Sequence, residues 1–195
     1  MSPTVTAAPP IPTRPSTGRI IARWMISFAG FPLGGVAAIL LTGPLASTTS
    51  ALTGGLVTGA VLGLVQAWAM RAERRLLLAW VVATAVGMAL GLAIESQVMG
   101  FATSLSDLAL QGVFCGAAVG LAQAVVLWSR IGRIALAWPA YLAGVWAIGW
   151  TVTTSIGVKV SEQFVVFGSS GALVATVLTA VLPVVLAGRA TQRRA

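Results

Sequence analysis

Six apolar stretches, each close to 20 residues long and without a charge in its middle, dominate the sequence. A helix needs about 20 apolar residues to cross the hydrocarbon core of a bilayer, so each stretch predicts one membrane span. The hydrophobic content of 57% and the charged content of 8% exclude an ordinary soluble domain. The predicted spans cover residues 20–41, 51–70, 76–94, 108–128, 134–156 and 164–187.

A spaced pattern of small residues recurs in the second, fourth and sixth stretches. On a helix that turns by about 100° per residue, the positions of each copy fall on one stripe. The third copy is the faintest. The equivalent residues are Gly55, Gly59, Gly63 and Gln66; Gly112, Gly116, Gly120 and Gln123; and Gly168, Ala172, Thr176 and Thr179.

These stripes predict helix-packing faces, because small residues at this spacing let helices approach closely in lipid. The glutamines share the face, so their amides should point into the protein. We expect Gln66, Gln123 and Thr179 to form a polar layer, either a clamp between helices or a solute-facing constriction. The predicted packing residues are Gly55, Gly59, Gly63, Gly112, Gly116 and Gly120.

The odd-numbered stretches repeat as well. Trp24, Trp80 and Trp138 each follow an arginine by five positions and precede a glycine by eleven. Together the two patterns give three copies of a helical hairpin, at about 19–71, 75–130 and 133–189. Because two spans restore the original direction, the copies should be related by an axis along the membrane normal. The expected fold is all-α, with six transmembrane helices in a pseudo-threefold bundle.

Arginines lie in alternate connections, which predicts the orientation by the positive-inside rule. Both termini should be cytoplasmic, in the cytoplasmic (inner) membrane of a bacterium. We expect a disordered cytoplasmic tail at 1–18, a transmembrane domain at 19–188 and a basic tail at 189–195. The arginines that predict the cytoplasmic side are Arg14, Arg19, Arg23, Arg71, Arg74, Arg75, Arg130, Arg133, Arg189, Arg193 and Arg194.

Other residues in the stretches are predicted to act through position or packing. Cys115 and the deeper tryptophans Trp146 and Trp150 should pack against other helices. Prolines at 32, 139 and 183 should kink helices. Five tryptophans near the cytoplasmic boundary predict an interfacial aromatic belt: Trp24, Trp68, Trp80, Trp128 and Trp138.

The hairpin pattern, GAVLGLVQAWAMR followed by LLLAWVVATAVGMALG, resembles a group of uncharacterised bacterial multispanning proteins. Their repeats carry G-x-x-x-G-x-x-Q, a basic turn and a Trp-led, glycine-rich span. The resemblance covers the second to fifth stretches, and Thr179 departs from the glutamine. It implies an architecture and no activity.

Groups for metal or acid–base chemistry are scarce. The sequence has no histidine, one cysteine and four acids, so a Cys/His metal site and histidine-dependent hydrolysis are excluded. We predict no cofactor and no enzymatic activity. Glu95 and Asp107 are read as a solvated loop pair rather than a cation site. Because the basic residues flank apolar stretches, they do not indicate nucleic acid.

Two functions remain open from the sequence. The first is a structural or accessory subunit that packs with partner helices, with lipids of the bilayer or with itself. The second is a passive facilitator of small solutes, with the Gln66, Gln123 and Thr179 layer as its constriction. A membrane enzyme is the least favoured class.

Overall fold

The computed structural model describes residues 16–100, 102–157 and 168–192, and these residues form helices without any strand. Of the predicted tails at 1–18 and 189–195, residues 1–15 and 193–195 lie outside the described residues, whereas Thr17 and Gly18 begin the first helix and Arg189 to Gln192 end the last one. The helices are α1 (Thr17–Met25), η1 (Ile26–Ala29), α2 (Gly30–Thr42), α3 (Thr48–Ala69), α4 (Arg74–Val98), α5 (Leu105–Ile131), η2 (Gly132–Ala137), α6 (Trp138–Ser155), α7 (Ser169–Thr179) and α8 (Val181–Gln192).

Five helical stretches in this described part are long and apolar enough to cross a membrane. They cover Thr17–Thr42, Thr48–Ala69, Arg74–Val98, Leu105–Ser155 and Ser169–Ala190. Their outer surfaces carry large apolar side chains, such as Leu40 at 79% exposure and Val125 at 78%. A protein surrounded by water rarely exposes so many, so the lengths, composition and surface together indicate a membrane protein.

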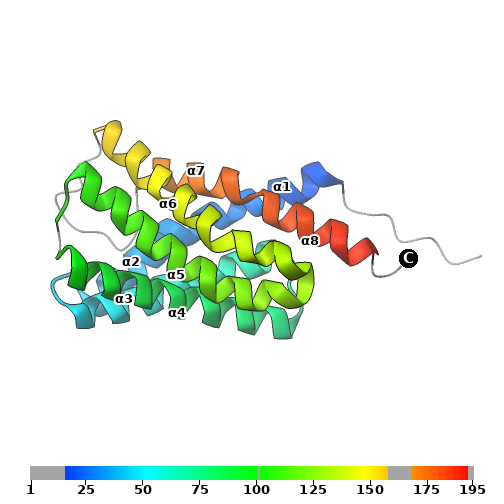
Figure 1. Ribbon diagram of the computed structural model, residues 1–195, viewed down its shortest axis with the longest axis horizontal. Helices are drawn as coiled ribbons and strands as arrows, with labels where there is room; N and C mark the ends of the chain where they lie inside the picture. Colours follow the sequence, from blue (N-terminus) through cyan, green and yellow to red (C-terminus); the bar gives the residue numbers. More distant parts are fainter. Residues whose placement is uncertain (1–15, 101, 158–167, 193–195) are drawn as a thin grey trace, which may run out of the picture.

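The longest of these stretches contains a reversal of direction. Gly132 ends α5 with a φ of 60°, a conformation that glycine adopts without steric cost. The short helix η2 follows, and α6 then runs back along α5 (Figure 1). Leu105–Ser155 is therefore one unbroken run of helical residues but two packed helices.

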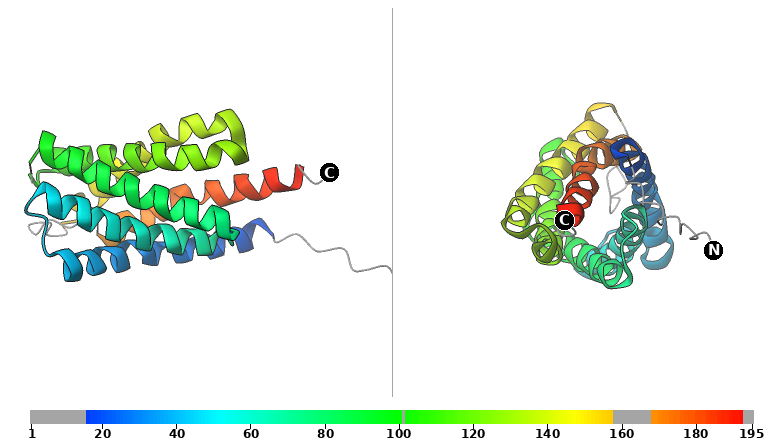
Figure 2. Two further views of the ribbon diagram at one scale, coloured as in Figure 1. Left: turned by 90° about the horizontal axis from the view of Figure 1, so that it is seen from below. Right: turned by 90° about the vertical axis from the view of Figure 1, so that its right-hand side faces the viewer.

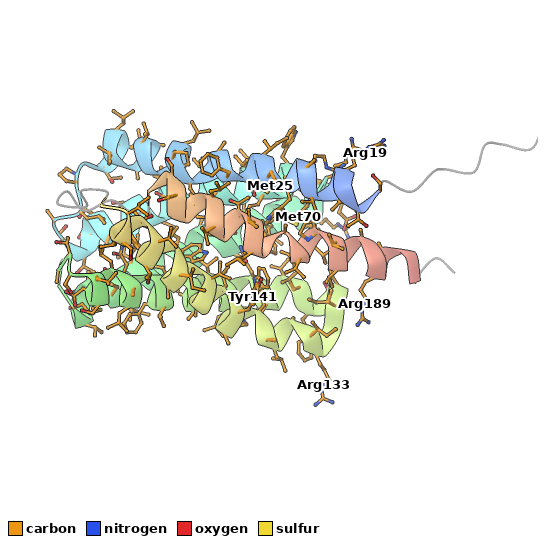
Figure 3. The ribbon with its side chains drawn as sticks, turned by 90° about the horizontal axis from the view of Figure 1, so that it is seen from above. Arg19, Met25, Met70, Arg133, Tyr141 and Arg189 are labelled. Atoms are coloured by element: carbon orange, nitrogen blue, oxygen red, sulfur yellow. The ribbon has the colours of Figure 1, made fainter. Side chains whose placement is uncertain are left out.

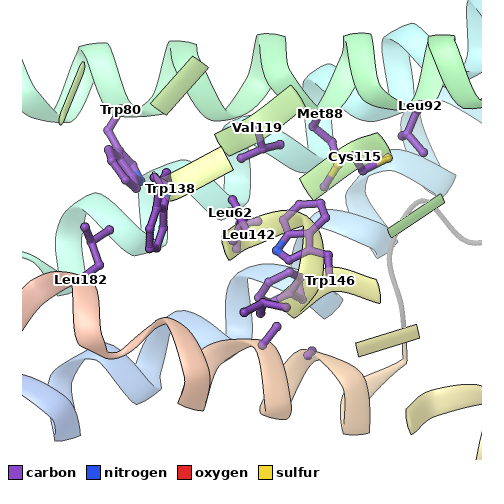
Figure 4. Close-up of a cluster of buried hydrophobic side chains, with 14 of the residues drawn as sticks. Leu62, Trp80, Met88, Leu92, Cys115, Val119, Trp138, Leu142, Trp146 and Leu182 are labelled. Carbon is purple, nitrogen blue, oxygen red and sulfur yellow. The ribbon is translucent and has the colours of Figure 1, made fainter. Parts of the chain in front are cut away.

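Each helix packs mainly against the next one in chain order, so the bundle forms a ring. Contacts run from α2 to α3, α4, α5, α6 and α7 in turn. The first and last helices close the ring, because α1 packs against α7 and α8 (Figure 2). The interior is filled by side chains from all sides, with Leu62, Met88 and Val119 among them (Figure 4).

Helix geometry changes shortly before each of the three prolines within these stretches. The 3₁₀ turn η1 ends three residues before Pro32, η2 ends two residues before Pro139, and α7 ends before Pro183. Proline has no backbone N–H and cannot donate to the preceding turn, which accounts for the local break. The breaks let α1–α2 and α7–α8 bend around the core.

Both described ends of the chain lie at the same end of the bundle. Thr17 begins α1 and Gln192 ends α8 at this end (Figure 1). Arg19, Arg133 and Arg189 lie there as well (Figure 3). We call it the arginine-rich end.

Candidate functional site

Three buried tryptophans donate hydrogen bonds to the three residues of the predicted polar layer. Trp80 Nε1 lies 3.0 Å from Gln66 Oε1, and Trp138 Nε1 lies 2.8 Å from Gln123 Oε1. Trp24 Nε1 lies 3.2 Å from Thr179 Oγ1 and 3.0 Å from the carbonyl oxygen of Thr176. Each bond joins two helices: α4 to α3, α6 to α5, and α1 to α7. We refer to these contacts as the tryptophan–polar pairs.

The two glutamines are not equally bonded. Gln123 also donates from Nε2 to Thr84 Oγ1 at 2.9 Å, so one amide connects α4, α5 and α6. Thr84 in turn donates to the carbonyl oxygen of Trp80. Gln66 has a partner for its amide oxygen, whereas its nitrogen finds none among the described residues. Gln123 is therefore the better-satisfied group and the more costly one to remove.

The tryptophan–polar pairs surround a small cavity on the bundle axis. Its volume is about 10 Å³, close to the minimum that holds one water molecule. Phe31 and Trp146 meet edge to face beside it, with ring centroids 6.1 Å apart. The axis is thus filled at this level by aromatic rings and aliphatic side chains.

The predicted tryptophan belt is wrong for three of its five members. Trp24 and Trp80 are 1% exposed and Trp138 is 8% exposed, so all three lie in the core. Trp68 and Trp128 are 59% and 51% exposed and do face outward. Distance from the arginines predicts how deep a tryptophan lies but not which way it points, and the indole N–H of the inward three finds an acceptor inside.

The glycines of the first two stripes lie where helices cross closely. A Cβ on Gly59 would come within 2.6 Å of the α4 backbone at Ala85, and one on Gly116 within 2.5 Å of the Leu142 carbonyl oxygen in α6. The same geometry recurs along both stripes, with Gly55 and Gly63 against α4 and Gly112 and Gly120 against α6. No larger residue fits without moving a backbone.

The third copy packs differently. Gly168 precedes α7 as its N-cap, while Ala172, Thr176 and Thr179 are buried within the helix. The closest approach of α7 is at Gly171, where a Cβ would lie 2.2 Å from the Gly149 carbonyl oxygen of α6. Gly171 was missed because it stands outside the three-copy register.

A second and larger cavity opens at the arginine-rich end, between α1, the α3–α4 turn, α5 and α8. Its volume is about 410 Å³. Apolar side chains such as Leu76 and Leu186 form part of its wall. Four arginines and one glutamate supply its charge: Arg23, Arg71, Arg130, Arg189 and Glu73. We call this cavity the arginine basin; the sequence pattern predicted its arginines only as topology signals.

Two of the basin arginines are fixed by contacts at helix ends. Arg23 donates from Nε to the carbonyl oxygen of Ala69 at 3.0 Å, which satisfies one of the open carbonyls at the end of α3. Arg130 forms an ion pair with Glu73, and this pair ties the end of α5 to the α3–α4 turn. Neither contact was predicted.

Arg71 has an unusual backbone conformation. Its φ is 53°, and it is the only described residue other than glycine with a positive φ. The left-handed conformation costs a residue with a side chain about 1 kcal/mol, and glycine is the usual choice after a helix end. Arg71 therefore occupies a position that glycine would adopt at lower cost.

The acidic residues at the opposite end correct one prediction. Glu95 is 4% exposed in the last turns of α4, so it is not part of a solvated loop pair. Asp107 lies in the first turn of α5, where its backbone N–H donates to Ser104.

In the described part of the chain, no three His, Cys, Asp or Glu side chains gather as a metal site would require. Cys115 is buried opposite Gly91.

Comparison with known proteins gives no relative. No family model, no curated protein and no solved structure matches the chain. The resemblance to multispanning proteins with repeated glycine-rich hairpins thus stays a prediction from the sequence, and the geometry of the two cavities carries the functional argument.

Proposed function

We propose that the chain is a six-span protein of three related hairpins, located in a bacterial cytoplasmic membrane with both termini inside. Two observations support six spans rather than five: the reversal at Gly132 and the packing of α6 along α5. The three tryptophan–polar pairs support the threefold relation, because each joins the start of an odd span to the end of the even span beside it.

The function that this geometry supports best is that of a structural or accessory membrane subunit, which packs with partner helices or lipids. The observation that carries the proposal is the filled axis. A facilitator needs a continuous polar path, whereas the axial cavity has a volume of only about 10 Å³ and the polar groups around it bond to indoles. The outer faces, with residues such as Leu33 and Leu40 exposed, remain available for other helices or lipid.

The orientation can be tested with reporter fusions. Fusions of a periplasm-active and a cytoplasm-active reporter to each terminus should report a cytoplasmic location for both, because Arg19, Arg133 and Arg189 lie at the end where both described termini lie. Insertion of the same reporters between Gly43 and Ser47, at the opposite end, should report the outside. A chain with five spans would place its two termini on opposite sides and contradict the proposal.

The accessory role can be tested by gentle purification and by reconstitution. From native membranes, the protein should co-purify with another membrane protein in a fixed ratio. Reconstituted alone in liposomes, it should leave the permeability to glycerol and urea at the level of empty liposomes. Saturable solute flux through the protein alone would contradict the accessory role and favour the facilitator.

A further inference from the structure

The arginine basin has a volume typical of a ligand site, and the accessory role does not require such a site. Ligand pockets typically hold about 300–1,000 Å³, and the basin measures about 410 Å³. Its arginines come from separate elements: Arg23 from α1, Arg71 from the turn after α3, Arg130 from α5 and Arg189 from α8. A ligand group placed between these elements would have arginines on several sides.

The positive charge of the basin is not balanced by the acidic side chains that the structure describes. Glu73 is the only acid in the lining, and it pairs with Arg130. The sequence holds three other acids. Glu162 lies outside the described residues, and Glu95 and Asp107 lie near the end of α4 and the start of α5, at the opposite end of the bundle. Among the described residues, no further side-chain carboxylate therefore reaches Arg23, Arg71 or Arg189.

Arg71 adds an independent reason to expect a ligand. Glycine would adopt this left-handed backbone conformation at lower energetic cost, as it does at Gly132. Arg71, Arg130 and Arg189 are also evenly spaced along the sequence, at the ends of corresponding segments. The chain thus has an arginine at a backbone position that favours glycine, and Arg71, Arg130 and Arg189 all line one cavity.

We propose that the arginine basin binds a phosphate group carried by a partly apolar molecule. Guanidinium groups bond phosphate oxygens in pairs, and a tetrahedral phosphate can accept bonds from several sides at once. The apolar wall, which includes Ile20, Leu76 and Leu186, suits the body of such a molecule. Phosphate on this body can come from a lipid headgroup or from a soluble phosphate ester. The site goes beyond the proposed accessory role and does not depend on it.

The test uses the full-length protein in nanodiscs and three probes: phosphatidic acid added to phosphatidylcholine, glycerol 3-phosphate, and inorganic phosphate. The double variant Arg71→Gly/Arg189→Gln removes two basin guanidiniums and suits the backbone at 71. The control is Arg75→Gln/Arg133→Gln, which removes the same charge from exposed positions at the same end but outside the basin. The readouts are the thermal midpoint and the retained ligand by native mass spectrometry.

We expect saturable stabilisation of the wild type by at least one probe, weakened about tenfold or more in the basin variant and retained in the control. A response to phosphatidic acid alone assigns the site to a lipid headgroup, and a response to glycerol 3-phosphate as well assigns it to the shared phosphate ester. Equal weakening in both double variants, or no saturable response to any probe, overturns the proposal. If the double variant is unstable without ligand, Arg71→Gly alone gives the same comparison.

Discussion

Replacing Gly116 by leucine is expected to destabilise the bundle by about 3 kcal/mol or more. A side chain there would begin 2.5 Å from the Leu142 carbonyl oxygen and 2.8 Å from Ala143 Cα, so it meets the backbone of α6. Backbone cannot rotate away as a side chain can, and α5 and α6 would have to separate. The thermal midpoint of the purified protein in detergent should fall by roughly 10 °C.

Gly144 offers the matched control on the helix that Gly116 contacts. It is exposed, and a Cβ placed on it meets nothing within 4 Å. Gly144→Leu should leave the midpoint unchanged or raise it slightly, because leucine is the better helix former. Equal midpoints for Gly116→Leu and Gly144→Leu would mean that α5 and α6 do not cross as described.

Gln123→Leu should cost about 1–2 kcal/mol of unfolding free energy, more than Gln66→Leu. The change leaves the buried indole N–H of Trp138 without its acceptor and removes the bond to Thr84. Gln66→Leu removes one such bond, to Trp80. Chemical or thermal unfolding in mixed micelles measures the order of the two effects. Interhelical polar contacts in membranes average about 0.6 kcal/mol, which keeps the expected loss moderate.

A second substitution separates the hydrogen bond from packing. The double variant Gln123→Leu/Trp138→Phe has no indole N–H at position 138 that lacks an acceptor. Its loss of unfolding free energy should therefore be smaller than the sum of the losses in the two single variants. Strict additivity would show that the Gln123–Trp138 contact contributes nothing beyond the volume of its side chains.

The sequence predicted the helices well because membrane spans are set by length and apolar content. Their arrangement depends on information that hydropathy lacks. The predicted spans at 108–128 and 134–156 implied the reversal between α5 and α6, where Gly132 lies, but hydropathy did not predict which faces of the helices meet. The tryptophans show the same limit. Nearby arginines predicted that Trp24, Trp80 and Trp138 lie at the membrane–water interface, whereas their side chains turn inward and form hydrogen bonds in the core.

A signal for two of the tryptophan–polar pairs was present in the sequence. Gln66 and Trp80 are 14 residues apart, and Gln123 and Trp138 are 15 apart, so each glutamine is followed by a tryptophan across a short turn. Two helices joined by such a turn bring residues at equal depth together. The third pair spans 155 residues, between Trp24 and Thr179, and no local spacing could reveal it. The arginine basin was missed for the same reason, because its walls come from helices far apart in sequence.

The contact between Trp24 and α7 has a consequence for biogenesis. As helices leave the translocon in chain order, α3 with α4 and α5 with α6 can satisfy their indole and amide groups as soon as each pair is inserted. Trp24 finds its acceptors within the folded protein only on α7, so this bond forms after α7 is inserted. The first helix is thus held in an incomplete assembly until synthesis is nearly over. A nascent chain stalled before residue 169 would expose this helix to membrane quality control and to any insertion chaperone that recognises an unpaired polar group.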